Sequence, residues 1–162
     1  MRVIDPNLDG ITHINVYSGS RTELGRMLSN FCREEIYTKD GRFMSVEAYW
    51  FWLGISPDCK ERECMRDLFG YQAKANGTYL REVYPGEQIE DFQDRIIRAI
   101  WYKAKRHTDL FLPEYENLPL KHYYVNRNGS VRDVYGKYWW MIEAEEKMKR
   151  YIYEVKKQLW RN

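Results

Sequence analysis

Two turn dipeptides, Asp40-Gly41 and Asn128-Gly129, constrain the fold of this chain more than any other feature. Each stands between β-prone residues, which is the strongest short-range signal of a tight hairpin turn with positive φ. We therefore expect a β-hairpin around each dipeptide. The segment 11–17, ITHINVY, alternates Ile14 and Val16 with polar neighbours, and this period of two predicts a further half-buried strand, followed by a loop, SGSRTELGRM.

Capping signals predict two helices after the first hairpin. Ser45 is the expected N-cap of a short helix over 46–53, ending near glycine. Ser56-Pro57 then places a proline at the first helical position, so a second helix is expected over 57–75, stopping at Asn76-Gly77.

Two longer segments carry apolar residues at helical spacing, which predicts one buried stripe on each. The stripe in 87–107 consists of Ile89, Phe92, Ile96, Ile100 and Ala104, and the C-terminal stripe of Met141, Met148, Ile152, Val155 and Leu159. With 162 residues and 44% hydrophobic content, the chain can bury one sizeable core. Together these signals predict a single domain over 1–162 with a compact, helix-rich α+β fold and short β-hairpins.

The charge balance argues against bulk nucleic acid and membranes as partners. The formal net charge is only +2, from 26 basic and 24 acidic residues, so we expect no strong non-specific nucleic-acid binding. The start, MRVIDPNLDG, lacks the apolar run of a signal peptide, and YWFWLGI is too short to span a bilayer. Cys32, Cys59 and Cys64 do not form a disulfide framework, which agrees with a cytoplasmic protein.

Common catalytic motifs are missing from the sequence. His13, His107 and His122 are scattered, and Cys59 and Cys64 lack a second pair of ligands, so we expect no metal or other cofactor. No nucleophile elbow, phosphate-binding glycine loop or dinucleotide fingerprint is present. Aromatic residues make up 16% of the chain, more than one core needs, so some of them are expected to line a site for a flat heterocycle or sugar.

Four segments, INVYSGS, LSNF, DGRFMSVEAYW and AIWYKAKRHTDL, are similar in sequence and spacing to the NADAR family of YbiA-like domains. The resemblance covers about residues 14–112. It implies a helix-rich α+β fold and the hydrolysis of N-glycosidic bonds. Some members resemble enzymes that process ribosylated aminopyrimidine intermediates of riboflavin synthesis, and others remove ADP-ribose from modified guanine bases.

Three features depart from the family pattern. Ala48 stands where the family has a histidine after the glutamate, and YWFWLGI replaces the segment with the family glutamine and lysine. The family's C-terminal D-x-x-W-G segment is not recognisable in NRNGSVRDVYGKYWW, although Asp133 is a candidate late carboxylate.

The aligned glutamate, Glu47, is the catalytic candidate. If Ser45 caps the helix, Glu47 lies in the first turn, where the helix dipole is expected to lower its pKa and favour the carboxylate. Cleavage of a ribose–nitrogen bond builds positive charge at the anomeric carbon, and a fixed anion stabilises that charge or directs water. The alternative is a purely structural acid that interacts with the dipole, worth about 0.3–1 kcal/mol.

The other candidates are assigned to substrate binding. Asn30, after Ser29, offers a donor and an acceptor for ribose hydroxyls or phosphate, or for loop backbone groups. Tyr17, Phe31 and Trp50 are candidates for stacking on the base, although core positions are common for aromatic residues. Tyr17 and Trp50 are the favoured pair.

Basic residues supply the candidates for phosphate binding. Lys103 aligns with a family lysine, but it lies off the apolar face of its helix, so a solvated side chain is the favoured interpretation. Arg21 and Arg26 precede the LSNF segment, and their guanidinium groups suit bidentate pairing with a diphosphate.

The leading hypothesis is a metal-free N-glycosidase that removes ADP-ribose from a guanine-type base, either free or within a nucleic acid. Two alternatives stay open within the nucleotide class: action on ribosylaminopyrimidine intermediates, and an inactive module that binds ADP-ribose or a nucleotide. A third is an interaction protein with a vestigial pocket.

Overall fold

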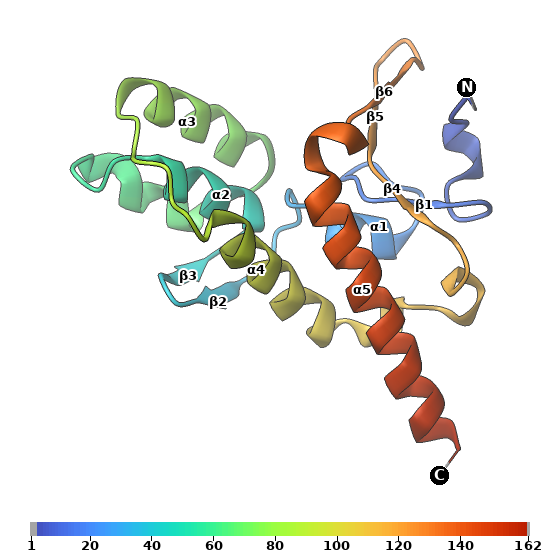
Figure 1. The fold of residues 1–162 in the computed structure, drawn as a ribbon. Helices are drawn as coiled ribbons and strands as arrows, with labels where there is room; N and C mark the ends of the chain where they lie inside the picture. Colours follow the sequence, from blue (N-terminus) through green and yellow to red (C-terminus); the bar gives the residue numbers. More distant parts are fainter. Residues whose placement is uncertain (1–2, 162) are drawn as a thin grey trace. The chain divides into compact units, whose positions relative to one another are not determined.

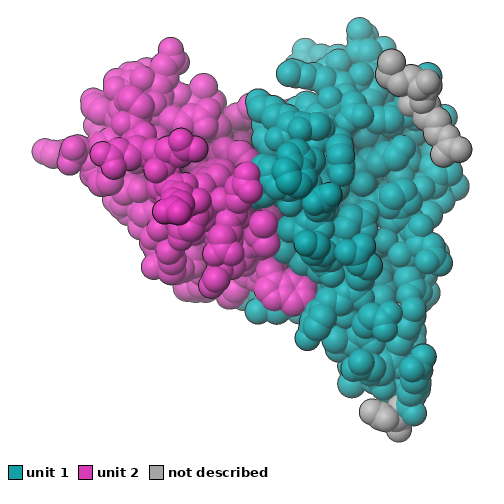
Figure 2. Space-filling model, viewed as in Figure 1, with its two compact units in different colours: residues 1–29, 104–162 teal, residues 30–103 magenta. Residues whose placement is uncertain are grey.

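The computed structural model describes residues 3–161 and shows a helix-rich α+β fold with short strands (Figure 1). Its internal contacts divide the chain into two units, one formed by residues 1–29 with 104–162 and the other by residues 30–103 (Figure 2). The second boundary falls inside one helix, α4 (Phe92–Arg106). The expected fold class is confirmed, whereas a single domain over 1–162 stays a prediction.

The first predicted hairpin and the capped helix are present in unit 2. Strands β2 (Ile36–Thr38) and β3 (Gly41–Phe43) pair antiparallel, and Gly41 has a φ of +106°, as its turn position requires. Helix α2 (Val46–Gly54) follows directly, and its Ser45 hydroxyl accepts a hydrogen bond from the Ala48 amide at 3.0 Å. Both local predictions are confirmed.

The predicted helix over 57–75 is wrong. A 3-10 segment, η2 (Lys60–Asp67), comes first, and α3 (Gly70–Val83) then runs straight through Asn76-Gly77. The reason is packing against α2: a Cβ at position 77 would lie 2.2 Å from Cγ of Phe51. Gly77 therefore permits the close approach of two helices and does not end one.

Helix α4 starts five residues later than expected, so it contains the predicted apolar stripe except Ile89. Ile96, Ile100 and Ala104 are fully buried, as their spacing predicts. The preceding stretch 87–91 is not helical and carries exposed or half-buried residues.

Unit 1 contains the second hairpin and a parallel strand pair. Strands β5 (Tyr123–Val125) and β6 (Val131–Asp133) form the predicted ribbon, with Gly129 at a φ of +82°. The N-terminal strand is only β1 (Ile14–Asn15), and it pairs in parallel with β4 (Leu120–Lys121).

The other elements of unit 1 are helical. Residues expected to form a loop contain α1 (Glu23–Leu28), which Thr22 caps by accepting from the Gly25 amide at 2.9 Å, so that prediction is wrong. The terminal helix α5 (Tyr135–Trp160) buries Met141, Met148 and Ile152. Its predicted stripe ends there, because Leu159 is 68% exposed. Single 3-10 turns occur at Pro6–Leu8 (η1), Thr108–Leu110 (η3) and Pro113–Tyr115 (η4).

Among residues 3–161, no helix combines the length and apolar character that crossing a bilayer requires. Cys32, Cys59 and Cys64 are free thiols.

Candidate active site

The predicted site residues are distributed over both units. Asn30, Phe31, Glu47, Trp50 and Lys103 belong to unit 2, whereas Tyr17, Arg21, Ser29 and Asp133 belong to unit 1.

In unit 2, the structure brings Glu47 next to the LSNF segment. The Glu47 backbone amide donates to the Asn30 carbonyl at 3.0 Å, which fixes the loop against the first turn of α2. This contact joins two segments of the family-like pattern that are separated by the whole β2–β3 hairpin. Ser45 anchors the same turn, because its hydroxyl also donates to the Leu68 carbonyl at 2.9 Å.

The Glu47 carboxyl group has an environment that was not expected from its helix position. No hydrogen bond or ion pair of this carboxyl group occurs within residues 3–161. Burial raises its pKa from 4.5 to about 7, against the opposing effect of the positive charges of Lys74 and Arg81. The expected lowering of the pKa is therefore wrong, because loss of solvent outweighs the helix dipole.

A carboxyl group with this pKa exchanges protons near neutral pH, as a general base or acid must. At about pH 7 roughly half of the molecules carry the carboxylate. Structural first-turn acids are normally solvated and ionised, so the burial of Glu47 favours a chemical role over a dipole-pairing role.

The two aromatic candidates of unit 2 are half-buried and packed against other rings. Phe31 meets Tyr71 edge to face, with centroids 5.2 Å apart, and Trp50 meets Phe92 at 4.9 Å. Both rings therefore keep partial exposure on one side while their orientation is fixed by a neighbour.

Lys103 is fully buried, contrary to the favoured interpretation of a solvated side chain. Its charge acts on Cys32, where it opposes the rise in thiol pKa that burial causes. A lysine is rarely buried unless polar or charged groups compensate its ammonium group, so burial of Lys103 indicates a defined position inside the protein and not a solvated side chain.

Sequence reasoning missed the contribution of α3 to this region. The positive charges of Lys74 and Arg81 act to lower the pKa of Glu47. The ring of Tyr71 packs edge to face against that of Phe31. Their shared face could have been found from the spacing of 71, 74, 78 and 81, but only in a helix that continues past Gly77.

In unit 1, Tyr17 belongs to an aromatic cluster. Its ring centroid is 5.7 Å from that of Tyr124, and His122 lies between Tyr124 and Tyr138 at 5.5 and 5.6 Å. The His122 Nδ1 atom lies 2.7 Å from the Val16 carbonyl, which assigns the proton to Nδ1. Burial lowers the His122 pKa, so the ring is neutral at pH 7.

Four other predicted residues of unit 1 make local structural contacts. Arg21 donates through Nη1 to the Asn7 carbonyl at 2.7 Å, and Arg26 donates to the Ser20 carbonyl at 2.7 Å. Ser29 is buried and closes α1 through its amide, which donates to Gly25. Asp133 accepts from the Tyr135 amide at 2.9 Å at the start of α5.

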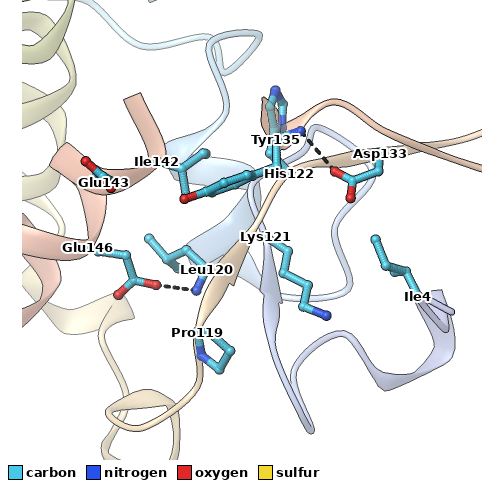
Figure 3. Close-up of a pocket in the computed structure, with 10 residues that line it drawn as sticks. All are labelled: Ile4, Pro119, Leu120, Lys121, His122, Asp133, Tyr135, Ile142, Glu143 and Glu146. Atoms are coloured by element: carbon cyan, nitrogen blue, oxygen red, sulfur yellow. Dashed lines mark hydrogen bonds between the residues drawn. The ribbon is translucent and has the colours of Figure 1, made fainter. Parts of the chain in front are cut away.

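Asp133 also lines a pocket of about 430 Å³ in unit 1 (Figure 3). Glu143 and Glu146 line it as well, with Lys121 as a basic residue. Glu146 accepts from the Leu120 amide, and Figure 3 shows this bond on the pocket wall. Three carboxylates against one ammonium group make the pocket unsuitable for a nucleotide diphosphate. Residues 3–161 contain no group of three or more His, Cys, Asp or Glu side chains arranged to hold a metal ion.

Comparison with known proteins gives a likeness of fold. No family model matches the chain, and no curated protein matches its sequence. The NMR structure of the E. coli protein YbiA is similar, with a TM-score of 0.59 over 96% of both chains at 18% sequence identity. The chain thus has the YbiA fold, in agreement with the fold implied by the four sequence segments.

Proposed function

We propose that this protein is an N-glycosidase that hydrolyses the bond between C1′ and a base nitrogen, with Glu47 as the essential carboxylate. The observation that carries the proposal is the half-buried carboxyl group of Glu47 in the first turn of α2, whose burial raises its pKa to about 7. The backbone amide of the same residue bonds the Asn30 carbonyl. The YbiA fold and the family-like segments support the same reaction class.

The proposed reaction needs one water molecule and one carboxylate. The C1′–N bond breaks, its electron pair goes to the base nitrogen, and the water oxygen bonds to C1′. Ionised Glu47 stabilises the positive charge at C1′ and takes a proton from the attacking water. The base nitrogen gains the proton that Glu47 took from the water, which returns Glu47 to the carboxylate, so the products are the free base and the ribose-bearing fragment.

ADP-ribose on a guanine-type base is the proposed substrate class, either as a small molecule or within a nucleic acid. In unit 2 we propose Asn30 for the ribose hydroxyls and Phe31 and Trp50 for stacking on the base, because both rings are only half-buried. In unit 1 the half-buried ring of Tyr17 is likewise proposed as a stacking residue. Arg21, Ser29, Lys103 and Asp133 stay in the proposed binding set, although the contacts described above give Arg21, Ser29 and Asp133 local roles. No cofactor is proposed.

The test is chromatographic release of free base from ADP-ribosylated guanosine and from a ribosylaminopyrimidine phosphate. Glu47→Gln keeps the size of the side chain and removes its charge, so turnover should fall by about 10²-fold or more while ADP-ribose binding persists. Turnover of the aminopyrimidine alone would move the substrate class to riboflavin intermediates. Binding without wild-type turnover would identify an inactive binding module and contradict the proposal.

A further inference from the structure

Helix α3 presents two cations at the edge of its buried face. Ala73, Gly77 and Leu80 form the side of α3 that is buried in unit 2. Lys74 and Arg81 are seven residues apart, so they lie on the same side of the helix, next to this buried stripe. Both side chains belong to exposed residues.

The two cations face the catalytic candidate. The positive charges of both side chains act to lower the Glu47 pKa, and Arg81 lies over the ring of Phe51, which follows Glu47 by one turn on the same face of α2. Arg81 is held in place from two directions: its guanidinium carbon lies 4.8 Å from the Phe51 ring centroid, and its Cδ atom would be 3.0 Å from a Cβ at Gly54. The absence of a side chain at Gly54 therefore leaves space for Arg81 along α2.

Neither cation has a carboxylate partner within residues 3–161, in contrast to three arginines of unit 2. Within the described part of the chain, Lys74 and Arg81 form no ion pair. Arg42, Arg66 and Arg95 are each paired with an aspartate or glutamate at 3.1 Å or less. Two positive charges without a carboxylate partner thus lie on the side of α3 next to its buried face, and this charge balance favours an anionic ligand.

An exposed aromatic side chain lies next to these two cations on α3. Tyr71 precedes Lys74 by three residues on α3, is 75% exposed and packs edge to face on Phe31. A carboxyl group, two cations and an exposed ring on one side of unit 2 match the parts of a nucleotide: sugar, phosphate and base.

From this arrangement we propose that Lys74 and Arg81 form a subsite that binds the phosphate or diphosphate of the substrate beside Glu47. The inference rests on the proposed function for the identity of the substrate, but phosphate binding itself requires no turnover. Arg81 supplies a planar donor set for two phosphate oxygens, and Lys74 supplies a mobile point charge.

Titration calorimetry with inorganic pyrophosphate and with ADP-ribose tests the subsite. Lys74→Gln with Arg81→Gln should weaken both ligands at least tenfold, whereas Lys60→Gln, which removes an exposed lysine of η2, should leave affinity unchanged. Lys74→Glu alone should weaken pyrophosphate similarly, and it leaves the packing of Arg81 intact. Equal affinity in wild type and in all these variants would overturn the proposal.

Proton uptake on ligand binding provides a second measurement, which would not change if Lys74 and Arg81 had only a structural role. A bound anion offsets the fields of Lys74 and Arg81, so the Glu47 pKa should rise and binding at about pH 7 should take up protons. Heats measured in two buffers of different ionisation enthalpy report this uptake, which Glu47→Gln should abolish. Pyrophosphate binding that depends on both cations but involves no proton uptake would overturn their placement beside Glu47.

The outcomes distinguish a failure of the proposed phosphate subsite from a failure of the proposed reaction. Pyrophosphate affinity that depends on Lys74 and Arg81 without any wild-type turnover would support the subsite and contradict the proposed function. Turnover of ADP-ribosylated guanosine that is unchanged in the double variant would support the reaction and overturn the subsite.

Discussion

At the scale of single residues, the burial that gives the Glu47 carboxyl group a pKa near neutrality also destabilises the fold when this group is ionised. Its position after a serine N-cap could be predicted from the sequence, but its pKa could not, because burial is a tertiary property. Lys103 was mispredicted for a similar reason, since a position off the apolar stripe is still fully buried. Charges of buried side chains depend on neighbours that are distant in sequence.

The raised pKa of Glu47 predicts that Glu47→Gln stabilises the protein at alkaline pH. The folded-state pKa of about 7 exceeds the unfolded value of 4.5, so wild-type stability should fall as pH rises between these values. Above about pH 7 the variant should be more stable by about 2–3 kcal/mol, and at about pH 4 the two should be equal. Urea unfolding at several pH values measures the difference; a variant of equal stability at about pH 8 would contradict the burial of a charged form.

At the scale of elements, turn and capping signals in the sequence predicted those elements whose formation depends on nearby residues. Both hairpins and α2 follow from turn glycines and one capping serine. Helix α3 was misplaced because Asn76-Gly77 normally ends helices, whereas here Gly77 accommodates the Phe51 ring. The six-residue α1 was missed because so short a helix carries little periodicity.

The packing of α3 predicts opposite effects for two glycine-to-alanine substitutions in helices. Gly77→Ala should destabilise the protein by about 2 kcal/mol, because overpacking against Phe51 exceeds the gain in helix propensity of about 1 kcal/mol. Gly136→Ala is the matched control, since its Cβ would meet no atom within 4 Å in α5, and it should stabilise by about 0.5 kcal/mol. Urea unfolding measures both, and a stabilising Gly77→Ala would show that α2 and α3 are not closely packed.

At the scale of the whole molecule, charge is balanced and much of it is paired. The net charge of +2 predicted weak attraction to nucleic-acid backbones, and the ion pairs of Arg42, Arg66 and Arg95 reduce the free positive charge further. The fold likeness to YbiA extends over 96% of the chain, well beyond the segments that carry the sequence resemblance.

This charge balance predicts that recognition depends on the modified base and not on the nucleic acid around it. Unmodified duplex DNA should bind with a dissociation constant weaker than about 100 µM at physiological salt, since few phosphates can be neutralised. Fluorescence anisotropy with labelled duplexes checks this, with an ADP-ribosylated oligonucleotide as the positive comparison. Tight, salt-sensitive binding of the unmodified duplex would contradict it.

The most direct test of Glu47 as the working carboxylate is the pH dependence of kcat/KM for release of base from ADP-ribosylated guanosine. Because the reaction needs the ionised form, kcat/KM should rise about tenfold per pH unit below about pH 7 and level off above it. Glu47→Gln should remove both the rate and the inflection. A wild-type profile that is flat across neutral pH, or a variant that retains wild-type rates, would show that another group performs the reaction.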